Sequence, residues 1–277
     1  MIVQLHCGRF RLSLERPLIM GVVNITPDSF SDGGRFLDPA AAIAHAHRLI
    51  EEGADLVDLG AESSRPGAAA VVSVDEELRR LLPVLQGLRG APVPVSVDTI
   101  KPEVMRAALA EGASMINDIN ALRSPGAIAA VLASDAAVCL MHMQGTPGTM
   151  QQHPRYGDVV AEVNAFLLER VRAVRDAGIA PGRIAIDPGF GFGKTLEHNL
   201  ELLRHLREFD ALGVPVLAGW SRKSSLGKIT GKPAADRLAA SLAAALIAAQ
   251  NGARILRVHD VAATRDALAV LAAVENT

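Results

Sequence analysis

Short apolar runs alternate with amphipathic stretches along almost the whole chain. The runs are continuous and rich in β-branched residues, which predicts strands buried on both faces. The stretches between them, such as 39–54 and 75–88, place apolar residues at helical spacing and charges on the other face, which predicts helices. We expect eight strands, at 18–24, 54–60, 93–98, 114–119, 136–143, 183–188, 214–219 and 253–259.

Glycine follows several expected helices just before the next strand. A glycine in this place adopts the left-handed conformation that ends a helix. The glycines concerned are Gly53, Gly112, Gly178, Gly213 and Gly252.

Eight regular repeats of strand, loop and helix predict an α/β fold of the (β/α)8 TIM-barrel type. A doubly wound open sheet is the alternative, but it rarely runs to eight regular units without a domain break. Alternation around Gly8 adds a short N-terminal β-hairpin. We expect a single domain over residues 1–277.

Composition excludes several function classes. The 277 residues are 49% hydrophobic and 21% charged, as in a globular protein, and the net charge of −2 offers no basic patch for nucleic acid. Two cysteines without metal-ligand spacing suit a reducing compartment. The N-terminus lacks a secretory pattern, and the apolar stretch 239–249 is too short to span a bilayer. We therefore expect a cytoplasmic protein with no membrane and no nucleic-acid partner.

Polar residues gather where the expected strands end. In a TIM barrel the loops after the strands form the active site, so these side chains are expected to converge. Each alone has a structural explanation, because a buried Asp can cap a helix, and Asp58 and Asp118 fit either reading. The strand-end residues are Asn24, Asp58, Glu62, Asp98, Asn117, Asp118, His142, Asp187, Arg257 and His259. Together they predict a polar pocket.

The pocket is expected to have two poles. Arg222 and Lys223, presented together after the seventh strand, join Arg257 and Arg65 in a set of cations that suits a phosphate or diphosphate. Asn24 beside such an oxyanion suits Mg²⁺, which takes ligand oxygens from phosphates.

The second pole is acidic. Asp98 and Asp187, with Asn117, are expected deeper in the pocket. A buried carboxylate needs donors, and a heterocycle with an N–H beside an NH₂ group supplies two.

The stretch "DPGFGFGKT" (187–195) looks like a phosphate-binding P-loop, but its spacing is wrong. Gly189 leaves three residues before the Gly-Lys pair where a P-loop needs four, and Pro188 stands at the required glycine. We reject that reading and interpret Phe190 and Phe192 as a wall for a planar ligand.

Seven stretches together, in order from residue 20 to residue 261, resemble the dihydropteroate synthase family of folate biosynthesis, the sulfonamide target. They are "NITPDSFSDGG", "DLGAESSRPGA", "SVDTIKPEVMRAALAEGASMINDI", "LMHMQGTPGTMQ", "DPGFGFGKTLEHNLELL", "GWSRKS" and "RVHDV". Ala61 and Ser64 depart from the commoner Gly and Thr, and Ser64 keeps the hydroxyl.

The resemblance implies a TIM-barrel homodimer that uses Mg²⁺. It would condense 6-hydroxymethyl-7,8-dihydropterin diphosphate with p-aminobenzoate to give 7,8-dihydropteroate and diphosphate, with diphosphate lost before the arylamine attacks. Carried over by motif, the pterin diphosphate residues are Ser64, Arg65, Asp98, Asn117, Met141, Asp187, Gly219, Lys223, Arg257 and His259. The catalytic residues that the resemblance implies are Asp98, Asp187, Lys223, Arg257 and His259. The p-aminobenzoate residues are Phe30, Ser64, Phe192, Lys223 and Ser224, and the metal ligand is Asn24.

The loop "TPDSFSDGG" is interpreted as a lid that excludes water, with Phe30 and Asp32 reaching over the second substrate. Two other readings remain. A corrinoid-linked methyltransferase shares the carboxylates but would lack "SSRPG" and "SRKS", and a catalytically silent paralogue would keep the fold alone.

Overall fold

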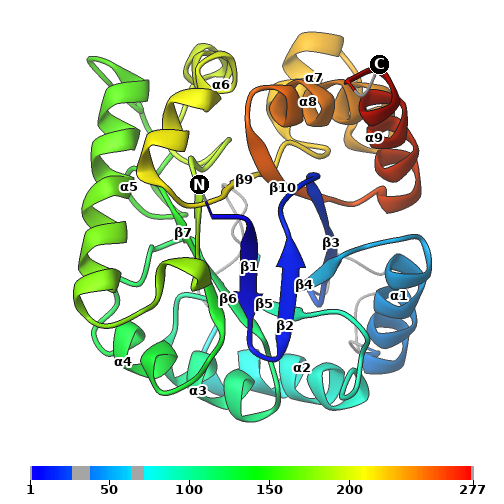
Figure 1. The fold of residues 1–277 in the computed structure, drawn as a ribbon, viewed down its shortest axis with the longest axis vertical. Coiled ribbons are helices and arrows are strands. Elements are labelled where there is room, and N and C mark those ends of the chain that lie inside the picture. Colours follow the sequence, from blue (N-terminus) through cyan, green and yellow to red (C-terminus); the bar gives the residue numbers. More distant parts are fainter. Residues whose placement is uncertain (1, 27–37, 64–71, 276–277) are drawn as a thin grey trace.

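The computed structural model describes residues 2–26, 38–63 and 72–275. Within this part, eight parallel strands close into a barrel in the order β10-β3-β4-β5-β6-β7-β8-β9, and helices surround it (Figure 1). An antiparallel two-stranded hairpin precedes the barrel. The predicted TIM barrel and hairpin are confirmed.

The strands are β1 (Gln4–Cys7), β2 (Phe10–Ser13), β3 (Leu18–Asn24), β4 (Leu56–Gly60), β5 (Val95–Asp98), β6 (Met115–Asp118), β7 (Ala137–Met141), β8 (Ile184–Asp187), β9 (Val216–Ala218) and β10 (Ala253–Val258). The helices are α1 (Pro39–Glu51), α2 (Val74–Gly87), α3 (Pro102–Ala110), α4 (Ala127–Leu132), α5 (Val159–Asp176), α6 (Leu196–Arg204), α7 (Ser224–Thr230), α8 (Leu238–Gln250) and α9 (Val261–Glu275). Each barrel strand lies within its predicted range.

Local capping residues explain where several helices begin. Ser73 accepts a hydrogen bond from the Glu76 amide ahead of α2, and Thr195 forms a reciprocal capping box with His198 at the start of α6. The five glycines expected to end helices all have positive φ, from 70° to 107°. Sequence neighbours therefore account for these helix boundaries.

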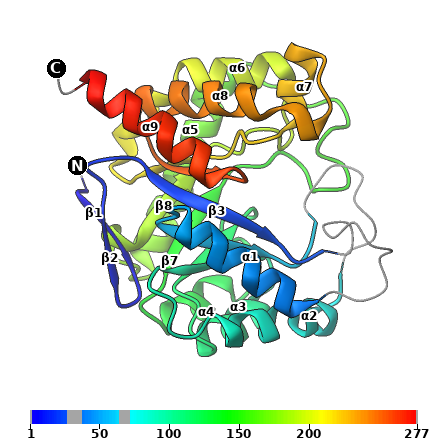
Figure 2. The same ribbon diagram turned by 90° about the vertical axis from the view of Figure 1, so that its right-hand side faces the viewer.

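The hairpin lies across the amino ends of the barrel strands. In Figure 2 it occupies one end of the molecule, and β3 runs away from it toward the other. Leu5, Cys7 and Leu14 are buried there and pack with inward-facing barrel residues such as Met20 and Met115. This end of the barrel is filled with apolar side chains, so room for a ligand lies at the carboxyl ends.

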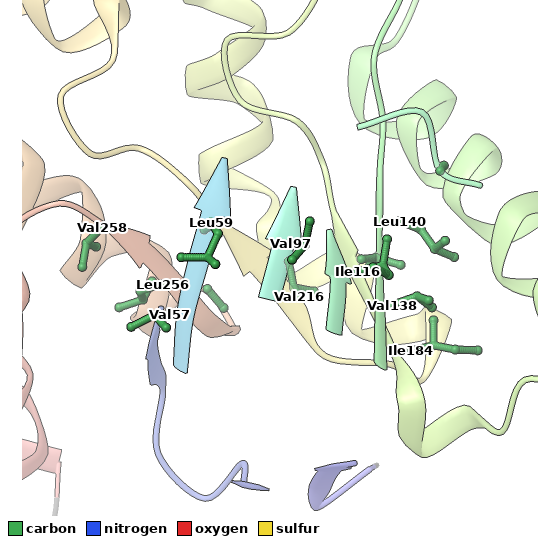
Figure 3. Packing of buried hydrophobic residues seen from close by; sticks show 14 of the residues in the cluster. Val57, Leu59, Val97, Ile116, Val138, Leu140, Ile184, Val216, Leu256 and Val258 are labelled. Atoms are coloured by element: carbon green, nitrogen blue, oxygen red, sulfur yellow. The ribbon is translucent and has the colours of Figure 1, made fainter. Parts of the chain in front are cut away.

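Outward-facing strand residues form the larger core, under the helices. Val57, Leu59 and Val97 belong to this cluster (Figure 3). Because successive strand residues point to opposite faces, Asp58 between Val57 and Leu59 points into the barrel. Among the helices of the described residues, none is long and apolar enough to cross a membrane.

Candidate active site

Charged side chains from three strands meet inside the barrel. Arg257 of β10 donates from Nε to Asp58 Oδ2 at 2.7 Å, and its Nη2 lies 3.5 Å from Asp98 Oδ2. Asn117 of β6 donates from Nδ2 to the same Asp58 oxygen at 3.1 Å. The strand register places Asp98 directly beside Asn117. The predicted convergence of Asp98, Asn117 and Arg257 is therefore present.

Asp58 lies at the centre of this network, although it was predicted only as a strand-end residue of open role and not as a catalytic or substrate residue. Its side chain is fully buried, and among the described residues its Oδ1 atom has no hydrogen-bond partner. The sequence left open whether this Asp capped a helix or faced the pocket, and it faces the pocket. The signal was a lone acid two residues before the end of an apolar strand.

The two predicted acids carry raised pKa values. Burial raises the pKa of Asp98 to about 7, the charge of Asp58 adds to the shift, and Arg257 opposes it. Burial also raises the pKa of Asp187, while Lys223 and the Gly189 amide, which donates to Asp187 Oδ1 at 2.7 Å, oppose the rise. Carboxylates this short of donors favour a ligand that brings N–H groups.

Lys223 closes the pocket from the loop after β9. Its ammonium donates to the Phe190 carbonyl oxygen and lies 4.9 Å from the centroid of the Phe192 ring, a cation–π distance. Burial lowers the pKa of Lys223 to about 8, and Asp187 opposes that shift. Lys223 and Asp187 thus form the second charged group of the site.

Two glycines lie beside these groups. A Cβ at Gly60 would lie 3.9 Å from Asn24 Oδ1 and 4.0 Å from Asp98 Cβ, and a Cβ at Gly219 would lie 3.8 Å from both Arg257 Cβ and Lys223 Nζ. These are ordinary van der Waals distances, so the backbones of Gly60 and Gly219 lie directly beside the polar groups of the site.

Apolar side chains form one wall of the site. Met141, beside Asp187 in the strand register, is buried and packs in a small cluster with Met143 and Met150, against which Phe192 rests. Met141, expected to line the pterin slot, and Phe192, expected to border the p-aminobenzoate site, both lie in this wall, and Phe192 contacts Lys223.

The outer edge of the site is more accessible. Asn24 ends β3 and is partly exposed, and Ser224 is exposed at the first turn of α7. His259 follows β10 and contacts Ser221, with 3.0 Å between Nδ1 and Oγ. Phe30, Asp32, Ser64 and Arg65 lie outside the described residues.

Phe190 is not part of a ligand wall. It is 1% exposed and packs against Trp220, with ring centroids 5.0 Å apart. Arg222 does not join Lys223 as a pocket cation either, because its guanidinium pairs with Asp260, 2.5 Å from Nη2 to Oδ1. Adjacent residues in these loops point in different directions, and the predictions for Phe190 and Arg222 are wrong.

Two further strand-end residues serve the fold. Asp118 accepts hydrogen bonds from the Asn120 and Leu122 amides in the turn after β6. It therefore caps this turn and does not cap α4, whose N-cap residue is Gly126. His142 packs edge-on against Phe166, and burial together with Lys194 lowers its pKa to about 3. A residue next to an inward-facing one points outward, which explains both positions.

Within the part of the chain that the structure describes, a metal at Asn24 would need further ligands beyond the protein side chains. Among the described residues, no three His, Cys, Asp or Glu side chains lie close enough to hold a metal ion together. Asn24 offers one oxygen at the edge of the pocket, which fits a hard cation that keeps waters and binds substrate oxygens, and does not fit a site made of protein ligands alone.

Comparison with known proteins agrees with this geometry. Residues 20–259 match the family described as "Pterin binding enzyme". The dihydropteroate synthase of Neisseria meningitidis serogroup B is 52% identical over 272 residues, which covers 96% of this chain and 95% of that protein.

Solved structures give the same result. The Xanthomonas albilineans dihydropteroate synthase with 4-aminobenzoic acid superposes with a TM-score of 0.93 at 56% identity and covers 100% of both chains. The Burkholderia cenocepacia enzyme complexed with 7,8-dihydropteroate has a TM-score of 0.91 at 52% identity, covering 99% of this chain and 97% of that one. The chain belongs to the pterin-binding enzymes and, within them, to the dihydropteroate synthases.

Proposed function

We propose that the pocket condenses 6-hydroxymethyl-7,8-dihydropterin diphosphate with p-aminobenzoate, giving 7,8-dihydropteroate and diphosphate. The observation that carries this proposal is the set of buried charges at the carboxyl ends of the barrel strands: Arg257 with Asp58 and Asp98, and Lys223 with Asp187. The carboxylates suit the donor-rich edge of a pterin, and the cations suit its diphosphate. The reading as a corrinoid-linked methyltransferase is disfavoured, since the relatives above are all dihydropteroate synthases.

In this proposal the acids bind the ring. Asp98 and Asp187 accept from ring N–H and NH₂ groups, and Asn117 adds an amide that both donates and accepts. Asp58 holds Arg257 and Asn117 in place through Oδ2, and its Oδ1 atom has no hydrogen-bond partner among the described residues. Negative charge beside the ring also favours the positive charge that develops there when diphosphate departs.

The leaving group is met by cations. Arg257 and His259 lie on the same strand end and are proposed to bind the diphosphate, with Arg65 added by the family resemblance. Asn24 would be the protein ligand of Mg²⁺, and the ion would neutralise charge on the departing diphosphate.

The second substrate is proposed to lie between Phe192, Lys223 and Ser224, with Phe30 and Ser64 added by resemblance. An arylamine is already a neutral nucleophile, so the site needs no strong base to activate it. The methylene C–O bond breaks, the C–N bond forms, and the amine loses one proton. Exclusion of water by the loops at this end favours attack by the amine over hydrolysis.

A coupled assay tests the proposal. Purified protein with Mg²⁺, pterin diphosphate and p-aminobenzoate should release pyrophosphate only when every component is present, and mass spectrometry should detect dihydropteroate. Release of pyrophosphate without p-aminobenzoate would indicate a hydrolase, and no release would indicate a silent paralogue.

The homodimer implied by the resemblance stays a prediction. Its support is α8, which has no charged residue and leaves Leu238 43% and Ile247 44% exposed, beside α9 with Val270 67% exposed. A second copy would bury this face. Light scattering should give twice the chain mass, and Ile247→Glu should lower it.

A further inference from the structure

Lys194 is a buried lysine for which the proposed reaction gives no role. Its side chain is 3% exposed, and its ammonium lies 3.0 Å from the Gly189 carbonyl oxygen, 3.0 Å from the Phe192 carbonyl oxygen and 2.9 Å from His142 Nδ1. The lowered pKa of His142 keeps that ring neutral, so Nδ1 can accept. The three N–H groups of a lysine are therefore directed at protein acceptors, and none is directed at a phosphate.

Burial lowers the pKa of Lys194 to about 7, and Asp187 opposes that shift. The neutral amine still has two N–H donors, so the contacts to Gly189 and Phe192 do not depend on full protonation. The charged groups that face Lys194 are Asp187 and Lys223, and His142 is the titratable group in contact with it.

The ammonium of Lys194 lies where two loops pack against each other, the loop after β7 (142–158) and the loop after β8 (188–195). We call this contact between the two loops the seam. Gly189, with φ of 73°, packs so closely that a Cβ there would overlap the His142 carbonyl oxygen. Gly193 packs equally on Gln144, since its Cβ would lie 2.7 Å from the Gln144 carbonyl oxygen. Tyr156 donates from its hydroxyl to the Gly193 carbonyl oxygen at 2.8 Å.

The same short loop supplies contacts to the site on its other side. The Gly189 amide donates to Asp187, the Phe190 carbonyl accepts from Lys223, and the Phe192 ring lies under the Lys223 ammonium. Lys194 bonds to two of these three residues through their carbonyl oxygens. Fixing the loop at the seam thus fixes the groups that border the second substrate.

We propose that Lys194 is a positioning residue that ties the β8–α6 loop to the β7–α5 loop and so sets the Phe192 ring and the Lys223 ammonium for p-aminobenzoate. This inference rests on the proposed function for its substrate, but the seam itself can be tested without substrate. Replacing Lys194 with an apolar side chain removes a donor from the Gly189 and Phe192 carbonyl oxygens. The Gly189 oxygen keeps the Phe192 amide as a donor at 3.0 Å, and the Phe192 oxygen loses its contact across the loops, which is costly for a buried polar group.

The test compares Lys194→Met with Arg183→Met as a matched control. Arg183 is also a partly buried cation that donates to carbonyls, at 2.8 Å to Ala136 and 3.3 Å to Val131, but at the amino ends of the same two strands. For Lys194→Met we expect the KM for p-aminobenzoate to rise about tenfold and the KM for pterin diphosphate to change less than about threefold. Arg183→Met should lower thermal stability and leave both KM values unchanged.

Trp220 gives a second readout that needs no substrate. It is the single tryptophan of the chain and packs on Phe190 in the loop that Lys194 holds. Its fluorescence should become more accessible to acrylamide in Lys194→Met and stay protected in Arg183→Met. If Lys194→Met does not fold, Lys194→Gln, which keeps N–H donors, is measured in the same way.

A double mutant shows whether Lys194 acts through Phe192. The effect of Lys194→Met on the KM for p-aminobenzoate should largely disappear in a Phe192→Ala background, because residues that act through one another are not additive. Unchanged kinetics with unchanged Trp220 quenching, fully additive effects, or equal rises in both KM values would overturn the proposal. An inactive wild-type protein would overturn the proposed function instead, and the fluorescence comparison would still decide whether the seam depends on Lys194.

Discussion

Individual site residues are buried charges that only partly compensate one another. Asp58 pairs with Arg257 at 2.7 Å, but Asp98 shares that guanidinium only at 3.5 Å. Taking a carboxylate out of water is costly unless donors replace the water, and Asp98 has the weakest set of donors. This shortage of donors raises the pKa of Asp98. A ligand that donates two N–H groups would supply the missing hydrogen bonds.

The affinity for a pterin should therefore depend on pH. The pKa of Asp98 is about 7, so the carboxylate is ionised above that pH and protonated below it. A protonated acid must lose its proton before it can accept two donors, so affinity should fall as pH falls, by roughly tenfold per unit below pH 7. Calorimetry with pterin diphosphate at pH 5.5 to 8 measures the slope, and Asp98→Asn should bind weakly with a shallower slope, since Asp187 still titrates. An equally steep slope in Asp98→Asn would assign the titration to another group.

Asp187→Asn should abolish measurable pterin binding, because an amide cannot accept from two ring donors as a carboxylate does. Asp118→Asn is the control, since that buried acid accepts from the Asn120 and Leu122 amides and does not face the pocket. Asp118→Asn should lose stability and keep pterin affinity. Unchanged calorimetric affinity in Asp187→Asn would remove Asp187 from the ring site.

At the scale of elements, loop geometry depends on glycines that allow close approach. Gly189 and Gly213 have similar φ values, 73° and 70°. Only Gly189 touches another loop, whereas a Cβ at Gly213 would meet nothing within 4 Å. Substituting alanine at both positions therefore distinguishes two losses of stability. Gly213→Ala reports the strain of a left-handed backbone alone, and Gly189→Ala reports that strain together with the broken contact between loops.

Gly189→Ala should lower the free energy of unfolding by about 3 kcal/mol or more, since the backbone of His142 must move. Gly213→Ala should lower the free energy of unfolding by only about 1 kcal/mol, which is the strain of a non-glycine residue in the left-handed conformation. Chemical denaturation measures both. Equal losses would show that the close packing of the two loops contributes no stability.

At the scale of the whole molecule, the residues that form the inner apolar core and the residues of the polar pocket lie at opposite ends of the barrel. The hairpin and the inward-facing residues near it form one apolar cluster, and the polar pocket lies at the other end. The amino end can therefore be changed without touching a ligand.

Leu5→Ala should lower the free energy of unfolding by about 2–5 kcal/mol, because this fully buried side chain would leave a cavity. Pterin affinity at a temperature where the variant is folded should stay the same. Leu200→Ala on α6, where the side chain is 37% exposed, should cost less than about 1 kcal/mol. A large loss of affinity in Leu5→Ala would mean that the two ends are coupled.

The sequence by itself determined the alternation of strands and helices, the glycines that end helices, the hairpin and the barrel. The strands, the helices and their ends depend on neighbours within a few residues, and the barrel was inferred from the number and regularity of these units. It also placed Asp98, Asn117, Asp187 and Arg257 at strand ends, where a closed barrel must bring them together.

Only the tertiary structure decided the direction of individual side chains. The sequence left both Asp58 and Asp118 open, because a buried Asp at a strand end can face the pocket or serve as a cap. Only the pairing register of the strands decides which face each side chain takes. In the loops, the direction of a side chain depends on a contact with a residue far along the chain. Phe190 packs against Trp220 in the core, and Arg222 pairs with Asp260 away from the pocket. Lys194 likewise contacts His142 of the neighbouring loop, which is 52 positions away along the chain. Contacts between residues so far apart exist only once the barrel has closed.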